Sequence, residues 1–213
     1  MSLPLRTPLT VGAFLVCVSS SHAGFVALQS EKTIVSGKNV WRVYAKFSSA
    51  NDVLISCSGL QGLAGTVWNN SDFLGGTWSP QFTVDASVDS YVTIGGATGF
   101  ANTTAADPTW GAFGFNQQGI PNGAGWFNAS PENLQGKVDP VTLRTLIGQW
   151  VYTGSENFNP FSPLTVSYNQ GLGTPTQFAQ GTFIFFPSPG AIALLAPLVG
   201  LGRITSGGRR RTR

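Results

Sequence analysis

The strongest constraint on the fold is an alternation of apolar and polar residues over positions 40–47, which read VWRVYAKF. Strict alternation gives a strand one apolar face and one polar face, whereas a helix needs a period near 3.6 residues. The apolar positions, which share one predicted face, are Trp41, Val43, Ala45 and Phe47. This stretch therefore predicts a strand that is buried on one side only.

A second strand is predicted over 52–58, with Val53, Ile55 and Cys57 on one face and Cys57 packed as a small apolar residue. Clusters of Gly, Asn, Asp and Pro separate further strand patterns, as turns do. These patterns span 63–68, 80–85, 90–95, 111–115, 163–168 and 181–186. With 27 glycines and only 10% charged residues, the chain is expected to be all-β, an antiparallel β-sandwich of jelly-roll type.

One stretch, 139–153, carries a mixed pattern. Its apolar residues follow helical spacing at Leu143, Leu146, Ile147, Trp150 and Val151. An internal glycine and the β-branched residues favour a strand over 147–153 instead. We expect a short turn or helix over 139–145 followed by that strand.

The N-terminal 23 residues have the features of a secretory signal peptide. Arg6 precedes a short apolar stretch at 9–18, and Ser21-His22-Ala23 fits the small-x-small pattern before a cleavage site. Signal peptidase is then a partner, and it cuts between Ala23 and Gly24. The alternative is a buried N-terminal strand or helix.

Cleavage would remove His22, the only histidine, and Cys17, one of two cysteines. The mature chain would keep only Cys57, so no intramolecular disulfide could form. Triads that need histidine, and zinc sites built on histidine or several thiolates, are then excluded. We expect no cofactor, no metal and no catalytic residue, with calcium binding left open.

Charge separates the ends of the chain from its centre. Six of the 12 Lys and Arg lie in the end segments, while all nine acidic residues lie between Glu31 and Glu156. The central part has six basic and nine acidic residues, a net charge of −3. A basic nucleic-acid-binding face is therefore not expected on the folded part, and no nucleic-acid partner is predicted.

The last 28 residues read FPSPGAIALLAPLVGLGRITSGGRRRTR. An uncharged span of about 20 residues is long enough to cross a bilayer as a helix, and the arginines after it favour a cytoplasmic end. A final core element would leave the arginines unexplained, and a nucleic-acid tail conflicts with export. We therefore expect a C-terminal transmembrane helix that anchors the exported chain at least transiently.

The order of Pro-containing motif, apolar helix and arginine cluster resembles the PEP-CTERM sorting signal of exported bacterial proteins, in its V-P-x-P-G variant. The resemblance implies processing by an exosortase-like membrane enzyme, with 191–201 as the membrane segment. It implies a recognition motif at Pro187, Ser188, Pro189 and Gly190 and a basic stop at Arg209, Arg210 and Arg211. Ser188 stands where glutamate is usual, Pro197 interrupts the helix, and ITSGG separates Arg203 from the cluster.

The centre of the chain resembles uncharacterised β-rich domains that carry this signal, through DSYVTIGG (89–96) and GAGWFNASPENLQG (123–136). That resemblance implies no known activity. The predicted organisation is a signal peptide at 1–23, a β-sandwich domain at 24–186 and a sorting signal at 187–213. The predicted protein is exported to the cell envelope or the extracellular matrix and is not an enzyme.

Two other functions remain open. Trp78, Trp110 and Trp126 lie in predicted loops, where they could stack on sugars of an extracellular polysaccharide or instead cap the core. A glycosidase or lyase would need two carboxylates facing one cleft. Asp85, Asp89 and Asp107 are predicted to be solvated turn carboxylates instead.

Overall fold

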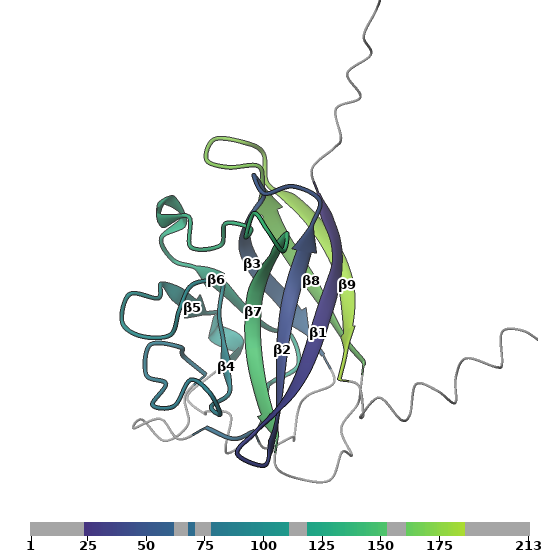
Figure 1. Cartoon of the computed structure of the whole chain (residues 1–213). Coiled ribbons are helices and arrows are strands. Elements are labelled where there is room, and N and C mark those ends of the chain that lie inside the picture. The colour runs from purple at the N-terminus through teal and green to yellow at the C-terminus, as the bar shows by residue number, and fades with distance from the viewer. Residues whose placement is uncertain (1–23, 62–67, 71–77, 111–118, 153–160, 186–213) are drawn as a thin grey trace, which may run out of the picture.

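The computed structural model describes residues 24–61, 68–70, 78–110, 119–152 and 161–185 (Figure 1). These residues form two antiparallel sheets and only two short 3₁₀ helices. The first sheet has the order β1-β2-β7-β4 and the second the order β5-β6-β3-β8-β9. In chain order the elements are β1 (Phe25–Val35), β2 (Lys38–Phe47), β3 (Val53–Leu60), β4 (Tyr91–Val92), β5 (Thr104–Ala106), η1 (Pro108–Trp110), β6 (Ala124–Asn128), η2 (Pro131–Asn133), β7 (Arg144–Tyr152), β8 (Phe161–Asn169) and β9 (Gln177–Ile184). The predicted all-β class is confirmed.

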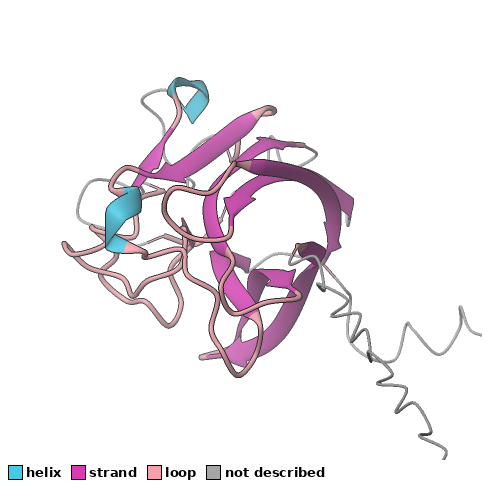
Figure 2. Ribbon diagram, turned by 90° about the horizontal axis from the view of Figure 1, so that it is seen from above, coloured by secondary structure: helices cyan, strands magenta, loops and turns pink. Residues whose placement is uncertain are grey.

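One hydrophobic core joins the inner faces of both sheets. Trp41, Phe47 and Trp150 come from the first sheet, and Leu54 and Trp126 come from the second. Figure 2 shows the strands of the two sheets curving around a common interior. Figure 1 shows the short strands β4, β5 and β6 on the same side of the domain.

A tight hairpin aligns β1 and β2. Ser36 and Gly37 both have positive φ, 49° and 74°, as a two-residue hairpin turn requires. Val35 pairs with Lys38 directly across this turn. On β2 the predicted face is confirmed, since Trp41, Val43, Ala45 and Phe47 are all buried.

Several predicted strands are present in the described residues. Strand β2 contains the predicted stretch 40–47, and β8 contains 163–168. Strand β3 contains 52–58 except for Asp52, and β9 overlaps 181–186. The strand expected over 147–153 is β7, which begins earlier, at Arg144. A turn at 140–142 precedes it, as expected for 139–145.

Other strand predictions need correction. Residues 80–85 form turns and bends, because Phe82 and Val88 close local bonds to Ser79 and Asp85 instead of joining a ladder. The strand expected over 90–95 is reduced to β4. The structure does not describe residues 63–67 of the stretch 63–68, nor the stretch 111–115. Strands β1, β5 and β6 were not predicted.

A β-bulge in β3 shifts its side chains relative to simple alternation. In β3, Leu54 pairs with Tyr168 and Ser56 with Ser167, so Ile55 is the extra residue. Leu54 and Cys57 therefore both reach the core, whereas Ile55 is only half-buried. The prediction that Val53, Ile55 and Cys57 share one face is wrong for this reason. The burial of Cys57 is confirmed, at 1% exposure.

Candidate functional site

Of the three tryptophans expected in loops, Trp78 lies in one, and the structure places the other two in short elements. Trp126 lies in β6 and Trp110 ends η1. Both are buried, and their indole N–H groups donate to backbone carbonyl oxygens, Trp110 to Gly125 at 2.8 Å and Trp126 to Thr93 at 3.0 Å. With their faces covered, these two rings cannot stack on a ligand in this state, and the core-capping interpretation fits them. Trp78 remains partly exposed.

The indoles form a row that runs from the loops into the core. Trp78 contacts Trp110 with ring centroids 5.8 Å apart, and Trp110 contacts Trp126 at 6.4 Å. Trp126 in turn contacts Trp150 of the opposite sheet at 6.4 Å. Trp78 therefore lies at the outer end of a packed aromatic row, and it is the one residue of the row that is not fully buried.

A buried network of amides and hydroxyls links the end of β4 to β5. Asn102 donates to Thr93 Oγ1 at 2.9 Å, and Thr104 Oγ1 accepts from the backbone N–H of Ile94 at 2.9 Å. Gln135 closes the network by donating to the Ile94 carbonyl at 2.9 Å and to Thr104 Oγ1 at 3.1 Å. These polar groups satisfy one another, so the network holds the loops together instead of offering free donors to a ligand.

The three turn carboxylates divide into two kinds. Asp85 is exposed, and its hydrogen bonds from the Ser87 hydroxyl and N–H lower its pKa. Asp107 accepts from the Thr109 N–H at 2.9 Å, as a turn residue does. Asp89 was expected to be solvated but is fully buried, because its carboxylate closes the turn by accepting from the Asp85 N–H at 2.9 Å.

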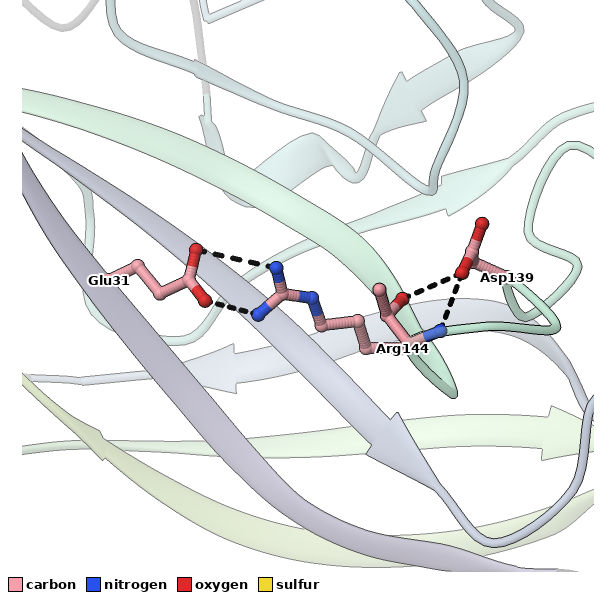
Figure 3. A network of polar contacts seen from close by, with 4 residues as sticks. Glu31, Asp139 and Arg144 are labelled. Atoms are coloured by element: carbon pink, nitrogen blue, oxygen red, sulfur yellow. Dashed lines mark hydrogen bonds and ion pairs between the residues drawn. The ribbon is translucent and has the colours of Figure 1, made fainter.

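A shallow polar groove of about 330 Å³ lies along the start of β7. The guanidinium of Arg144 stacks on the ring of Tyr44 at 4.0 Å and forms an ion pair with Glu31 of β1, reaching across β2 (Figure 3). The hydrogen bond that Arg144 donates to the Glu31 carboxylate raises the pKa of Arg144. Burial, followed by the charge of Glu31, raises the pKa of Tyr44. The polar residues of the lining are Tyr44, Gln135, Lys137, Asp139, Thr142, Arg144 and Thr145.

The second carboxylate near this groove is already occupied. Asp139 Oδ1 accepts from Thr142 N–H at 2.7 Å, from the Thr142 hydroxyl at 2.8 Å and from Val141 N–H at 3.0 Å, and the bonds within this turn lower its pKa. A general acid needs a raised pKa, so Asp139 is poorly suited to that role. The groove offers hydrogen bonds and a fixed cation, and the glycosidase or lyase hypothesis gains no support from it.

A second groove, of about 440 Å³, runs between β1 and β9, the outer strands of the two sheets. Figure 1 shows these strands side by side, and the hydroxyl of Ser30 donates to the Ile184 carbonyl. Gly181 lets the strands approach, because a Cβ there would lie 2.9 Å from both Leu28 Cγ and Phe25 Cζ. Its lining mixes polar and apolar groups of the two strands.

Sequence reasoning missed Asp52, the described acid whose pKa is raised. Asp52 is fully buried, and burial is the main cause of that shift. It directly precedes β3, so the sequence signal was an acid at the start of an apolar strand. Among the described residues, no three His, Cys, Asp or Glu side chains gather as a possible metal site.

Most predicted residues of the two end segments lie outside the described part of the chain. These are Ala23, Pro187, Ser188, Pro189, Gly190, Arg209, Arg210 and Arg211. Gly24 is described, and it pairs with Ser48 at the start of the domain. Neither 3₁₀ helix of the described residues is long and apolar enough to cross a membrane.

Comparisons of the chain with protein-family models, with curated proteins and with solved structures found no match.

Proposed function

We propose that this protein is an exported, non-catalytic β-domain of the cell surface or extracellular matrix. A signal peptide at 1–23 directs export, and an exosortase-like enzyme processes or anchors the chain through the motif at 187–190. Positions 191–201 form the membrane helix, and Arg209 to Arg211 form the basic stop. The two sheets pack as a jelly-roll-like sandwich, which the single core and the repeated crossing of the chain from one sheet to the other support.

The extent of the two sheets is the main support for this proposal. β1 begins at Phe25, next to the predicted cleavage point, and β9 ends at Ile184, just before the predicted motif. Cutting at these two positions would therefore remove no residue from either sheet. A working domain bounded by processing sites is expected to have this arrangement.

The burial of the Cys57 thiol is also compatible with export. Cys57 is buried, and burial raises the pKa of its thiol well above the usual range. Because the thiolate is the reactive form, this thiol is protected from oxidation and disulfide exchange. A single protected thiol is compatible with an oxidising compartment.

Intact-mass measurement of the protein exported by a host with exosortase tests the proposal. We expect a mature chain that begins at Gly24 and has lost the residues after the motif. Pro189→Ala should leave the C-terminal segment attached, whereas Ser188→Ala, at the variable position of the motif, should be processed as the parent is. A mature form that starts at Met1, or that keeps Arg213 without membrane association, would contradict the proposal.

Carbohydrate binding remains a second candidate, now restricted to Trp78. This residue is only partly buried and its ring contacts that of Trp110, and an aromatic ring held in this way can stack on a sugar. Titration with extracellular polysaccharide should quench tryptophan fluorescence in the parent but not in Trp78→Ala. Trp41→Phe, a buried control, should keep the response. Equal quenching in Trp78→Ala, or none in the parent, would rule out this candidate.

A further inference from the structure

Gly24 lies near Asp52 at the start of the domain, since the Gly24 N–H is one of the two backbone groups that act on the Asp52 carboxylate. Gly24 continues the β1–β2 pairing by one step, since its carbonyl accepts from the Ser48 N–H at 2.9 Å and its N–H donates to Ser48 Oγ at 2.9 Å. The Asp52 N–H donates to the carbonyl of Ser49 at 3.3 Å, which folds the β2–β3 connection back on itself. The carboxylate of Asp52 lies within this folded connection.

The Asp52 carboxylate has no positively charged partner among the described residues. The residue is 0% exposed, and neither carboxylate oxygen has a hydrogen bond of normal geometry among the described residues. Burial raises its pKa, and the N–H groups of Ser49 and Gly24 oppose this shift without removing it. A buried carboxylate without a cation is unfavourable at neutral pH, so a positively charged group at this position would stabilise the fold.

Within the described ranges, no neighbouring side chain supplies that charge. Tyr168 faces the corner from β8, and a Cβ on Gly24 would lie 3.3 Å from its hydroxyl. Lys137 and Asp139 flank Val138, whose N–H donates to the Asp52 carbonyl, and Lys46 lies on β2. None of these four side chains contributes to the shift of the Asp52 pKa.

Cleavage after Ala23 would create the missing cation. Hydrolysis breaks the bond between the Ala23 carbonyl carbon and the Gly24 nitrogen and consumes one water. The water oxygen and one hydrogen complete the Ala23 carboxyl group, and the other hydrogen goes to the Gly24 nitrogen. That amine then takes up the carboxyl proton at neutral pH and becomes an ammonium group with three donors. One donor can keep the bond to Ser48, which leaves two for Asp52.

We propose that Asp52 is a binding site for the α-ammonium group of Gly24, so that removal of the signal peptide completes a buried ion pair and stabilises the mature domain. This inference rests on the cleavage proposed above. It assigns to Asp52 opposite effects before and after processing. Before cleavage the carboxylate is an unpaired buried charge, and after cleavage it is one half of a pair.

Four purified proteins test this inference, all of which keep the C-terminal segment and are studied in the same mild detergent. Two begin at Gly24, exposed by removal of a fusion partner, and two begin at Ser21 and so retain Ser21-His22-Ala23. One of each pair carries Asp52→Asn. Urea unfolding at pH 7, followed by tryptophan fluorescence, gives the unfolding equilibrium constant of each protein.

In the chain that begins at Gly24, Asp52→Asn should raise the unfolding equilibrium constant at least tenfold, about 1.4 kcal/mol. In the chain that begins at Ser21 the same substitution should leave the constant unchanged or lower it. Asp85→Asn is the matched control, because Asp85 is exposed and bonded within its own turn, and it should act equally in both chains. Equal effects of Asp52→Asn in both chains, including unfolding of both, would overturn the inference.

Titration of the Gly24 Cα resonance gives a second readout that needs no stable variant. The pair should raise the pKa of the α-amino group above its ordinary range of about 7.7–8.0. The extra stability of the processed chain should then be complete below that range and disappear as pH rises through the raised pKa. An ordinary pKa in the parent would overturn the inference. The mass of the exported protein tests cleavage separately, so failure of one proposal is distinguishable from failure of the other.

Discussion

Gly136 lies where the segment after η2 crosses the start of β3, and alanine at this position should destabilise the domain strongly. A Cβ there would lie 1.9 Å from the carbonyl oxygen of Leu54 and 3.0 Å from Ile94 Cγ2. The two backbones would have to separate by about 1 Å to restore a normal contact. That separation would strain the bonds from Leu54 N–H to Gly136 O, 2.9 Å, and from Val138 N–H to Asp52 O, 3.1 Å.

The cost combines overpacking of about 1–3 kcal/mol with the weakening of two hydrogen bonds at about 0.5–1.5 kcal/mol each. We expect Gly136→Ala to lower the free energy of unfolding by about 4 kcal/mol. For a domain of this size, that corresponds to a fall of about 8–16 °C in Tm. Urea unfolding and thermal melts followed by tryptophan fluorescence would measure both quantities.

Gly37→Ala is the matched control, because Gly37 has a φ of 74° and no atom lies within 4 Å of the position that a Cβ would take there. It should cost about 1–2 kcal/mol from backbone conformation alone. A loss for Gly136→Ala no larger than that of Gly37→Ala would refute the close approach. An unchanged m-value in both variants would show that the substitutions change the free energy of unfolding and not the surface area that unfolding exposes.

Three further predictions concern other parts of the domain. Cys57 should not react with a disulfide reagent in the folded protein and should react fully after unfolding, because burial raises its thiol pKa; stoichiometric labelling of the native state would contradict this. Asp139→Asn should lower stability at pH 7 and leave it unchanged in strong acid, as urea titrations at several pH values would show. The reason is that folding lowers the pKa of Asp139. The stability that this carboxylate contributes is therefore present above the ordinary pKa of about 3.9 and is lost as pH falls through the folded pKa. Trp126→Phe should cost about 2 kcal/mol in thermal unfolding, since it removes the bond to the Thr93 carbonyl and leaves a cavity; a change under about 0.5 kcal/mol would argue against this packing.

The sequence predicted strands well where one face of a strand is buried without interruption. β2 follows this rule from Trp41 to Phe47, so alternation located both the strand and its inner face. β1 has no such clear pattern: it is an outer strand of its sheet, and Val26 and Ile34 are exposed. A strand at a sheet edge has fewer buried positions, so its hydrophobic period carries less information.

Bulges explain two of the places where periodicity was misleading, the inner face of β3 and the mixed pattern over 139–153. In β7, Val43 pairs with Gly148 and Tyr44 with Leu146, which makes Ile147 an extra residue. An extra residue turns a two-residue period into local spacings of three and four, which imitate a helix. The mixed pattern over 139–153 is therefore the trace of a bulged strand.

The positions of the loop tryptophans depended on contacts that are distant in sequence. The Trp126 indole donates to Thr93, and its ring meets Trp150 of the other sheet. Glycine and asparagine around Trp126 indicated a loop, but the burial of a large ring in the core outweighed the local preference. Only Trp78, at the outer end of the row, keeps an environment close to the predicted one.

The change of domain stability in acid depends on a few carboxylates. Neutral hydroxyls and amides, such as those of Thr104 and Gln135, join the loops, and their hydrogen bonds do not change with pH. Among the described carboxylates, Asp85 and Asp139 have lowered pKa values, so the stability that they contribute to the domain is lost as pH falls. Asp52 has a raised pKa in the uncleaved chain, so its contribution is full in acid and lost as pH rises through the folded pKa. An ammonium group on Gly24 would reverse that sign, and the processed domain should then be more stable near neutrality and more sensitive to acid than the uncleaved one.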